Sequence, residues 1–501
     1  MSTPTTDERH EDRAWGAFSD DAPWILDRTS IRWRAQVDRL RAAARAEVPR
    51  LTRPRRTPPG VRVAVVVARL GAALLPWYWR RRRGLHVDAA ASRADVSLRL
   101  RTAAEALGPS YIKLGQIISS GEGLFPTELV DEFKKCRDQV PAEPFDVVRL
   151  TIEQDLGCRL EDVFEHIDER PLAAASIAQV HAARLRTGEE VVVKVQRPTV
   201  ARLVRDDLEA MAWIAPMLVG RIPIAALANP PALVELFAET IVEELDFRIE
   251  AENMLDVAAV LHDLGQEQYV VPRPHPTLVT RRVLVMQRLS GFNFDDVAGM
   301  QDAGIDTQAV VRTGMIAFME GALIHGVFHG DLHGGNLFVM SDGRTALLDF
   351  GIVARLSQER RMAFLRLMLA ATTNDVTTLT GEEMVQEVQR VVKALLGYGA
   401  RLPKELMLYV KNMVFLDGAI ARLAPDLDLL GEIAQISMYF AQRHGERLAT
   451  ELGIDATRVE FDFDGVKAGF GLEADVDRLT YRELQERREL IQKRMRAHVG
   501  R

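Results

Sequence analysis

The chain has 501 residues, of which 47% are hydrophobic and 27% are charged. This is the composition of a globular protein, and the length suffices for two or three domains. The formal net charge of −7 excludes a basic nucleic-acid-binding protein, so we expect no nucleic-acid partner. The two cysteines, Cys136 and Cys158, lie in no CxxC or Cys/His pattern, which argues against a disulfide framework.

The chain begins with a polar region and an apolar, basic segment. Residues 1–59 are expected to be flexible or partly helical. Residues 60–91 contain the apolar stretch Val61–Trp79, which four arginines (80–83) follow. A spanning helix needs about 20 apolar residues, and this stretch is interrupted by Arg69 and Pro76. It predicts a helix at a membrane surface, anchored by the aromatic residues 77–79. A spanning helix and an ordinary packed helix are the alternatives.

The following elements predict two lobes. Residues 92–165 are expected to be a helical extension. Residues 166–290 combine β-branched runs with helical periodicity, and residues 291–501 are expected to be helical except for a hairpin within Asn336–Phe350. The expected strands are Val180–Leu185, Glu190–Val195, Tyr269–Val271 and Val283–Gln287, and the expected helices between them are Thr199–Leu218 and Pro231–Leu261. This order predicts an α+β, bilobal protein-kinase-like fold with a small β-sheet N-lobe and a helical C-lobe.

One motif pair in the helical lobe indicates phosphate chemistry. The sequence HGDLHGGN (329–336) is followed by LLDFG (347–351). Phosphoryl transfer needs oxygen ligands that hold Mg²⁺ on the phosphates, and a carboxylate that orients the acceptor. Asp331 is the candidate for the orienting base, while Asn336 and Asp349 are the candidates for the metal ligands. An HxDxxxxN element before DFG is specific for kinase-like chemistry.

A lysine in the small lobe completes the candidate catalytic set. Lys194 ends the strand-like run VVVK, as does the kinase lysine that contacts the α- and β-phosphates. Such a lysine needs a carboxylate partner on the following helix, and Glu250 is the best candidate.

The segment before Lys194 lacks the glycines that let kinase backbone amides close over phosphates. The corresponding residues, which we expect to cover the nucleotide, are Ala173, Ala174, Ala175, Ser176, Ile177, Ala178, Gln179 and Val180. Alanine disfavours the positive φ that glycine permits. The nucleotide lid must therefore have a different shape from a glycine-rich loop.

These residues resemble the UbiB/AarF (ABC1-type, ADCK-like) atypical kinase family from about residue 95 to about residue 430. The motifs are KLGQ (113–116), the alanine-rich loop, ELD (244–246), and the catalytic loop with DFG. The resemblance implies that the extension covers the active site, with Lys113 paired to Glu244 and Gln116 near the phosphates. Glycine stands at 334, where the family usually has proline. The hinge that would contact adenine is Met286, Gln287, Arg288 and Leu289.

The resemblance implies an Mg-ATP-binding kinase or ATPase, with ATP/ADP and Mg²⁺ as cofactors, in quinone or lipid metabolism. The expected partners are a nucleotide, a lipid, quinone precursor or other small molecule, a membrane surface, and proteins of quinone or lipid pathways. The expected location is the cytoplasm, peripheral at the inner face of the cell membrane. The alternatives are a small-molecule phosphotransferase resembling aminoglycoside or choline kinases, whose loop is also HGDxHxGN, and a nucleotide-binding regulatory scaffold.

Overall fold

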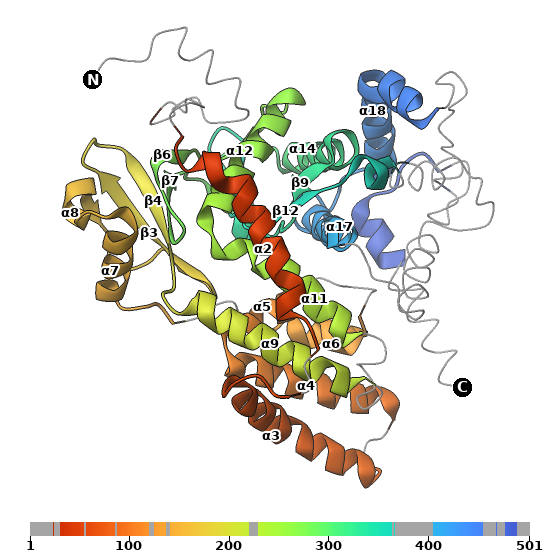
Figure 1. The fold of residues 1–501 in the computed structure, drawn as a ribbon. Coiled ribbons are helices and arrows are strands. Elements are labelled where there is room, and N and C mark those ends of the chain that lie inside the picture. The colour runs from red at the N-terminus through yellow and green to blue at the C-terminus, as the bar shows by residue number, and fades with distance from the viewer. Residues whose placement is uncertain are drawn as a thin grey trace.

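A computed structural model describes most of the chain, and Figure 1 shows its arrangement. The described residues are 24, 31–54, 57–85, 88–119, 125–136, 141–219, 229–362, 365, 404–453, 467 and 476–487. They form an α+β, kinase-like fold with a sheet-containing lobe, a helical lobe and a further group of helices at one end (Figure 1). Residues 488–501, which belong to the region expected to be helical, lie outside the described residues.

The small lobe is built on an antiparallel sheet with strand order β1-β3-β4-β7-β6, and β2 pairs with β3. Its central strand shows how alternation directs side chains. Val191, Val193 and Val195 of β4 are fully buried and share a core with helix α7, whereas Lys194 faces the opposite side of the sheet. The strands are β1 (Phe164–Ile167), β2 (Ala173–Ala174), β3 (Ala178–Leu185), β4 (Glu190–Gln196), β6 (Pro274–Val279) and β7 (Val283–Gln287). Helix α7 (Phe145–Leu156) packs against β4 and β7, and α8 (Leu160–Val163) lies beside β1.

The predicted helix over Pro231–Leu261 is wrong in one respect, because the chain breaks in the middle of that segment. It forms α11 (Pro230–Ile241), a 3₁₀ turn (Glu243–Leu245) and α12 (Phe247–Asp263). Asp246 caps α12 by accepting a hydrogen bond from the backbone N–H of Arg248 at 3.2 Å. Because of this break, Glu244 lies on the 3₁₀ turn and Glu250 on the first turns of α12.

The large lobe is mainly helical, and the predicted hairpin is present. Strands β10 (Leu337–Val339) and β11 (Thr345–Leu347) pair in antiparallel register, with Gly343 in the turn at φ +86°. The expectation that the rest of this region is helical is wrong, because short strands β8 (Phe292–Asn293), β9 (Val327–His329) and β12 (Val353–Arg355) also form. The helices are α13 (Val297–Asp302), α14 (Thr307–Glu320), α17 (Lys404–Leu423) and α18 (Leu429–Leu452), and β5 (Tyr269–Val270) pairs with β11.

The N-terminal helices form a separate packed group. Helix α2 (Val37–Leu51) crosses the face of the molecule from the sheet lobe to this group, and α3 lies at its outer edge (Figure 1). Arg34, just before α2, and Arg45 within it pair with Glu252 and Glu243 beside the broken helix. The group comprises α3 (Arg62–Arg82), α4 (Ala89–Leu107), α5 (Pro109–Ser119), α6 (Thr127–Phe133) and α9 (Val200–Leu218), with α11.

Helix α3 carries the segment expected at a membrane surface. Val63 and Val66 are buried in the core of the helical group. Trp77, predicted to belong to an aromatic anchor, is also buried, and its Nε1 donates to Ser92 at 3.1 Å. Only Tyr78 and Trp79 of that trio are about half exposed. Among the described residues, every helix falls short of the length and apolarity that crossing a membrane requires.

Candidate active site

Three charged side chains from different elements meet between the lobes. The Nζ of Lys194 on β4 lies 2.7 Å from Oε1 of Glu250 on α12 and 3.2 Å from Oδ1 of Asp349. Burial alone would lower the pKa of Lys194, but the charges of Asp349 and Glu250 outweigh that effect and raise it. The fold thus brings together three of the residues that the sequence singled out, with the lysine held as a cation.

The catalytic loop is organised by His329. Burial lowers the pKa of its ring, which is therefore neutral at pH 7. Nδ1 accepts a hydrogen bond from the backbone N–H of Asp331 at 3.1 Å, so Nε2 carries the proton and donates it to the carbonyl of Asp349 at 2.8 Å. One buried imidazole thus joins the backbone of the HGD segment to that of the DFG segment.

Asn336 and Asp349 are oriented by local contacts. Nδ2 of Asn336 donates to the carbonyl of Asp331 at 3.0 Å, which leaves the amide oxygen as the end that can face a cation. Asp349 has φ +55°, a conformation that non-glycine residues rarely adopt and that often marks functional sites. Enclosure by protein would raise the pKa of Asp349, but the charges of Lys194 and Lys113 lower it to about 2. Asp349 is therefore ionised at neutral pH.

The donor set fits a magnesium ion bound together with phosphates. Mg²⁺ prefers oxygen ligands and is usually held by one or two protein groups plus phosphates and waters. Asp349 offers a carboxylate and Asn336 an amide oxygen, and Oε1 of Glu244 is buried without a hydrogen-bond partner among the described residues. The described residues contain no cluster of three or more His, Cys, Asp or Glu side chains suited to hold a metal alone. A metal here would therefore need further ligands, such as phosphate oxygens or waters.

The helical extension reaches the cleft through α5. Nζ of Lys113 lies 3.2 Å from Oε2 of Glu244, and both side chains are largely buried. Burial raises the pKa of Glu244, Lys113 opposes this effect, and Asp349 adds to it. Gln116 lies one turn further along α5 and is half-buried. The structure therefore brings together the pair that the family resemblance implied.

The alanine-rich segment forms a tight hairpin. The N–H of Ala175 donates to the carbonyl of Ala178 at 2.8 Å, and Ala173 and Ala174 pair with Val180 and Gln179 across the turn. Among the described residues, the non-glycine residues with positive φ are Asn229 and Asp349. The alanine-rich hairpin therefore turns without a residue of positive φ. Its shape thus differs from a loop that requires glycine.

The hairpin is also anchored at its tip. The guanidinium of Arg197 donates to the carbonyls of Ala175 (3.0 Å) and Pro141 (2.8 Å) and to Glu143 (3.0 Å). Ile177 is buried in the core of the helical extension. The lid is therefore fastened to the extension, whereas the sequence indicated only that it lacks glycine.

The predicted hinge comprises the last two residues of β7, Met286 and Gln287, and the two residues that follow them. The N–H groups of Gln287 and Arg288 donate to the carbonyls of Arg273 (2.9 Å) and Glu190 (3.3 Å). Met286 is buried and pairs with Val192 of β4. The N–H groups of Gln287 and Arg288 are therefore already engaged within the protein.

Comparisons with known proteins agree with this geometry. A family model described as an ABC1 atypical kinase-like domain matches residues 135–382. An uncharacterized protein of Mycobacterium tuberculosis is 35% identical over 373 residues, which cover 67% of this chain and 76% of that protein. This chain belongs to the ABC1 atypical kinase-like family. An uncharacterized chloroplastic aarF domain-containing protein kinase of Arabidopsis thaliana is 30% identical (66% of this chain, 73% of that one).

Other matches carry the names expected within the ABC1 family. A probable protein kinase UbiB of Pseudomonas aeruginosa is 36% identical over 312 residues, 61% of this chain and 57% of that protein. Among solved structures, a Mycobacterium tuberculosis protein in complex with erythromycin has a TM-score of 0.41 at 21% identity, covering 62% of this chain and 87% of that one. That likeness is too weak to carry an argument.

Two residues that contact the catalytic loop were missed by the sequence analysis. Both lie on α17, beyond the segment that matches the ABC1 domain. Lys411 forms an ion pair with Asp331, and the neighbouring Asn412 is fully buried against the loop backbone. The only available signal was a Lys-Asn pair within the apolar run LMLYVKNMVFL (406–416).

Lys411 also lowers the pKa of Asp331. Burial alone would raise the pKa of Asp331, but Lys411 and Lys113 lower it below the ordinary aspartate value. A carboxylate that is so well stabilised is a weak base at neutral pH. Asp331 is therefore better suited to orienting an acceptor by hydrogen bonding than to removing its proton.

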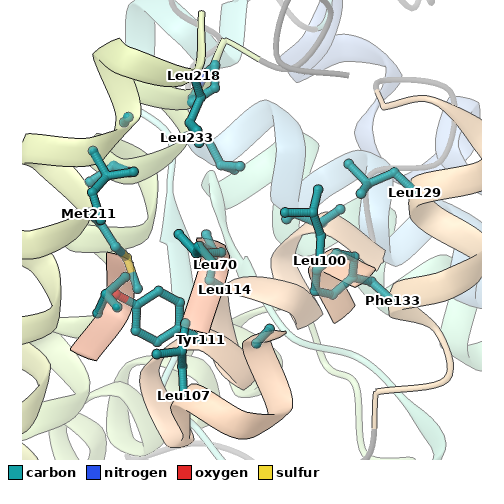
Figure 2. A pocket seen from close by; sticks show the side chains of 17 residues that line it. Leu70, Leu100, Leu107, Tyr111, Leu114, Leu129, Phe133, Met211, Leu218 and Leu233 are labelled. Carbon is teal, nitrogen blue, oxygen red and sulfur yellow. The ribbon is translucent and has the colours of Figure 1, made fainter. Parts of the chain in front are cut away.

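An apolar cavity lies on the other side of α5. Its volume is about 160 Å³, and Tyr111 and Leu114 of α5 line it together with side chains from five other helices. Figure 2 shows the lining side chains, with Leu70 of α3, Leu100 of α4, Leu129 and Phe133 of α6, Met211 of α9 and Leu233 of α11. An apolar cavity of this size can hold a small apolar group. Helix α5 thus contacts the charged cleft through Lys113 and the cavity through Leu114.

Proposed function

We propose that this protein binds Mg²⁺–ATP between its lobes and transfers or hydrolyses the γ-phosphate, as a UbiB-type atypical kinase or ATPase. The observation that carries the proposal is the meeting of Lys194, Glu250 and Asp349 within 3.2 Å beside a complete HGDxxxxN loop. In phosphoryl transfer, positioning and electrostatic stabilisation supply most of the catalysis. Each type of group that this chemistry needs is present in the cleft.

The residues take the following roles in this proposal. Lys194 binds the α- and β-phosphates and is fixed by Glu250. Asp349 and Asn336 hold Mg²⁺, which neutralises negative charge on the phosphates when it is bound. Asp331 orients water or an acceptor hydroxyl by accepting its hydrogen bond. Adenine lies against the hinge at Met286–Leu289, beneath the hairpin of the alanine-rich segment.

We also propose that the acceptor is water or a small molecule. The support is the cover over the cleft, where Lys113 of α5 pairs with Glu244 and Arg197 fastens the lid to the extension. A buried ion pair resists opening, because separating it leaves an uncompensated charge. A protein segment would have to displace this cover to reach Asp331.

We propose that the acceptor or regulator is an apolar molecule, such as a lipid or a quinone precursor, and that the protein binds it at a membrane surface. Helix α3 supports this idea because its inner residues Val66 and Leu70 line the cavity while Val65, Leu75 and Trp79 are exposed. Four arginines (80–83) follow the apolar part of α3. An exposed apolar face beside basic residues favours anionic bilayers.

The test is phosphate release by purified protein from Mg²⁺–ATP, with and without anionic liposomes. We expect turnover that liposomes stimulate and that Asp349→Asn abolishes. The double variant Arg81→Glu/Arg82→Glu should lose liposome flotation and stimulation. Arg159→Glu/Arg170→Glu, with the same charge change in the small lobe, should retain both. Phosphate transferred to a soluble molecule, without any effect of lipid, would favour a small-molecule phosphotransferase. Nucleotide binding without turnover would favour a regulatory scaffold.

A further inference from the structure

Lys411 is carried into the cleft by a helix that contains none of the catalytic motifs. It lies midway along α17, whose buried residues include Leu408, Tyr409 and Leu416. Its Nζ contacts Oδ1 of Asp331, and the two side chains are only 19% and 15% exposed. The sequence positions are 80 residues apart. The fold therefore places a buried ammonium group beside the residue that would orient the acceptor.

The position of Lys411 is set by its neighbour. Asn412 accepts a hydrogen bond from the backbone N–H of Leu332 at 3.1 Å and donates to the carbonyl of His329. These two bonds fix α17 to the catalytic loop on both sides of Asp331. Because Asn412 is fully buried, both bonds are costly to lose. Lys411 is thus held at this point of the cleft by the helix as a whole, with only its own side chain left to move.

The charges of the cleft show what Lys411 can do there. Lys194 is held by Glu250 and Asp349, and Lys113 by Glu244. Of the lysines placed in the cleft above, Lys411 is the one that contacts Asp331. In the function proposed above, Asp331 lies where the acceptor oxygen would meet the transferred phosphoryl group. An ammonium at that point would face the phosphoryl oxygens, which carry charge in the transition state.

We propose that Lys411 is a catalytic residue that binds the γ-phosphate, exchanging its contact with Asp331 for a phosphate oxygen when ATP is bound. This proposal rests on the proposed function of the cleft. During turnover, the bond between the γ-phosphorus and the bridging oxygen of ADP breaks, and a bond to the acceptor oxygen forms. The acceptor's proton passes to solvent. Lys411 remains an ammonium group throughout and releases the Asp331 carboxylate to orient the acceptor.

The experiment compares ligands with and without a γ-phosphate. Calorimetric affinities for Mg²⁺–ADP and for a non-hydrolysable Mg²⁺–ATP analogue, together with ATP turnover, are measured for Lys411→Met and Lys411→Arg. Lys404→Met is the matched control, because Lys404 lies on the same helix and donates to the carbonyl of Glu239 on α11. Lys411→Met should lower kcat about 100-fold and lower the affinity for the ATP analogue about tenfold, with the affinity for ADP unchanged. Lys411→Arg should retain part of the turnover, and Lys404→Met should match the wild type.

Several results would overturn the proposal. Equal loss of ADP and analogue affinity in Lys411→Met, with a lowered Tm, would show that Lys411 only supports the loop. Wild-type turnover in Lys411→Met would remove it from catalysis. If Lys411→Met does not fold, the same comparison is made with Lys411→Arg, and equal changes for both ligands count against the proposal. Failure of the wild type to bind either nucleotide would instead contradict the proposed function itself.

Discussion

The glycine of the KLGQ motif allows a close approach between two helices, and replacing it should be costly. A Cβ at Gly115 would lie 2.5 Å from Cδ1 and 2.8 Å from Cε1 of the buried Phe133 on α6. Alanine is favoured over glycine inside a helix by about 0.5–1 kcal/mol, whereas overpacking costs about 1–3 kcal/mol. Phe133 lines the apolar cavity, so its ring can retreat into that space. We therefore expect Gly115→Ala to lower the free energy of unfolding by about 1–2 kcal/mol.

Gly71 provides the matched control. It lies within α3, and a Cβ there would meet no atom within 4 Å. Gly71→Ala should therefore stabilise the protein by up to about 1 kcal/mol through helix propensity alone. Urea denaturation followed by circular dichroism compares the two variants with the wild type. If Gly115→Ala is as stable as Gly71→Ala, the close packing of α5 on α6 is not what requires glycine in the motif.

Three further predictions concern pH, the catalytic ion pair and the lid. Partial burial would raise the pKa of Asp155, but hydrogen bonds from Thr280 and Arg282 outweigh this and lower it. The ionised Asp155 therefore stabilises the folded protein above the ordinary pKa near 4, and this stabilisation is lost as the pH falls. Asp155→Asn should therefore cost about 2 kcal/mol at pH 7 and progressively less toward pH 3, and a cost independent of pH in urea titrations would refute this. Glu250→Gln should reduce ATP turnover about 100-fold by leaving its lysine partner unfixed, and wild-type turnover would contradict that role. Ala175→Gly should change the ratio of ADP to ATP affinity by loosening the lid, and an unchanged ratio by calorimetry would count against this.

Much of the site could be predicted because its residues lie in short local motifs. The spacing of Asp331, Asn336 and Asp349 is set by one loop and one hairpin, which the sequence indicates directly. The side of the sheet that Lys194 faces follows from strand alternation with its valine neighbours. Glu250 was identified by its position on the following helix, and the structure places it 2.7 Å from the lysine.

The features that the sequence analysis missed depend on tertiary contacts. Lys411 and Asn412 approach the loop from 80 residues away, and no local pattern connects them with it. The break before α12 was missed because the apolar periodicity continues on both sides of Asp246. Trp77 was assigned to an exposed anchor because a run of three aromatic residues does not show which of them faces the protein. Tertiary packing decided each of these cases.

The most direct test of the account measures the magnesium dependence of nucleotide binding. Isothermal titration of ADP into the wild type and Asp349→Asn, each with Mg²⁺ and with EDTA, isolates the contribution of the metal. We predict that EDTA weakens binding to the wild type at least about tenfold, and that Asp349→Asn binds weakly with or without Mg²⁺. Wild-type affinity and magnesium dependence in Asp349→Asn would contradict the assignment of this carboxylate as the principal metal ligand.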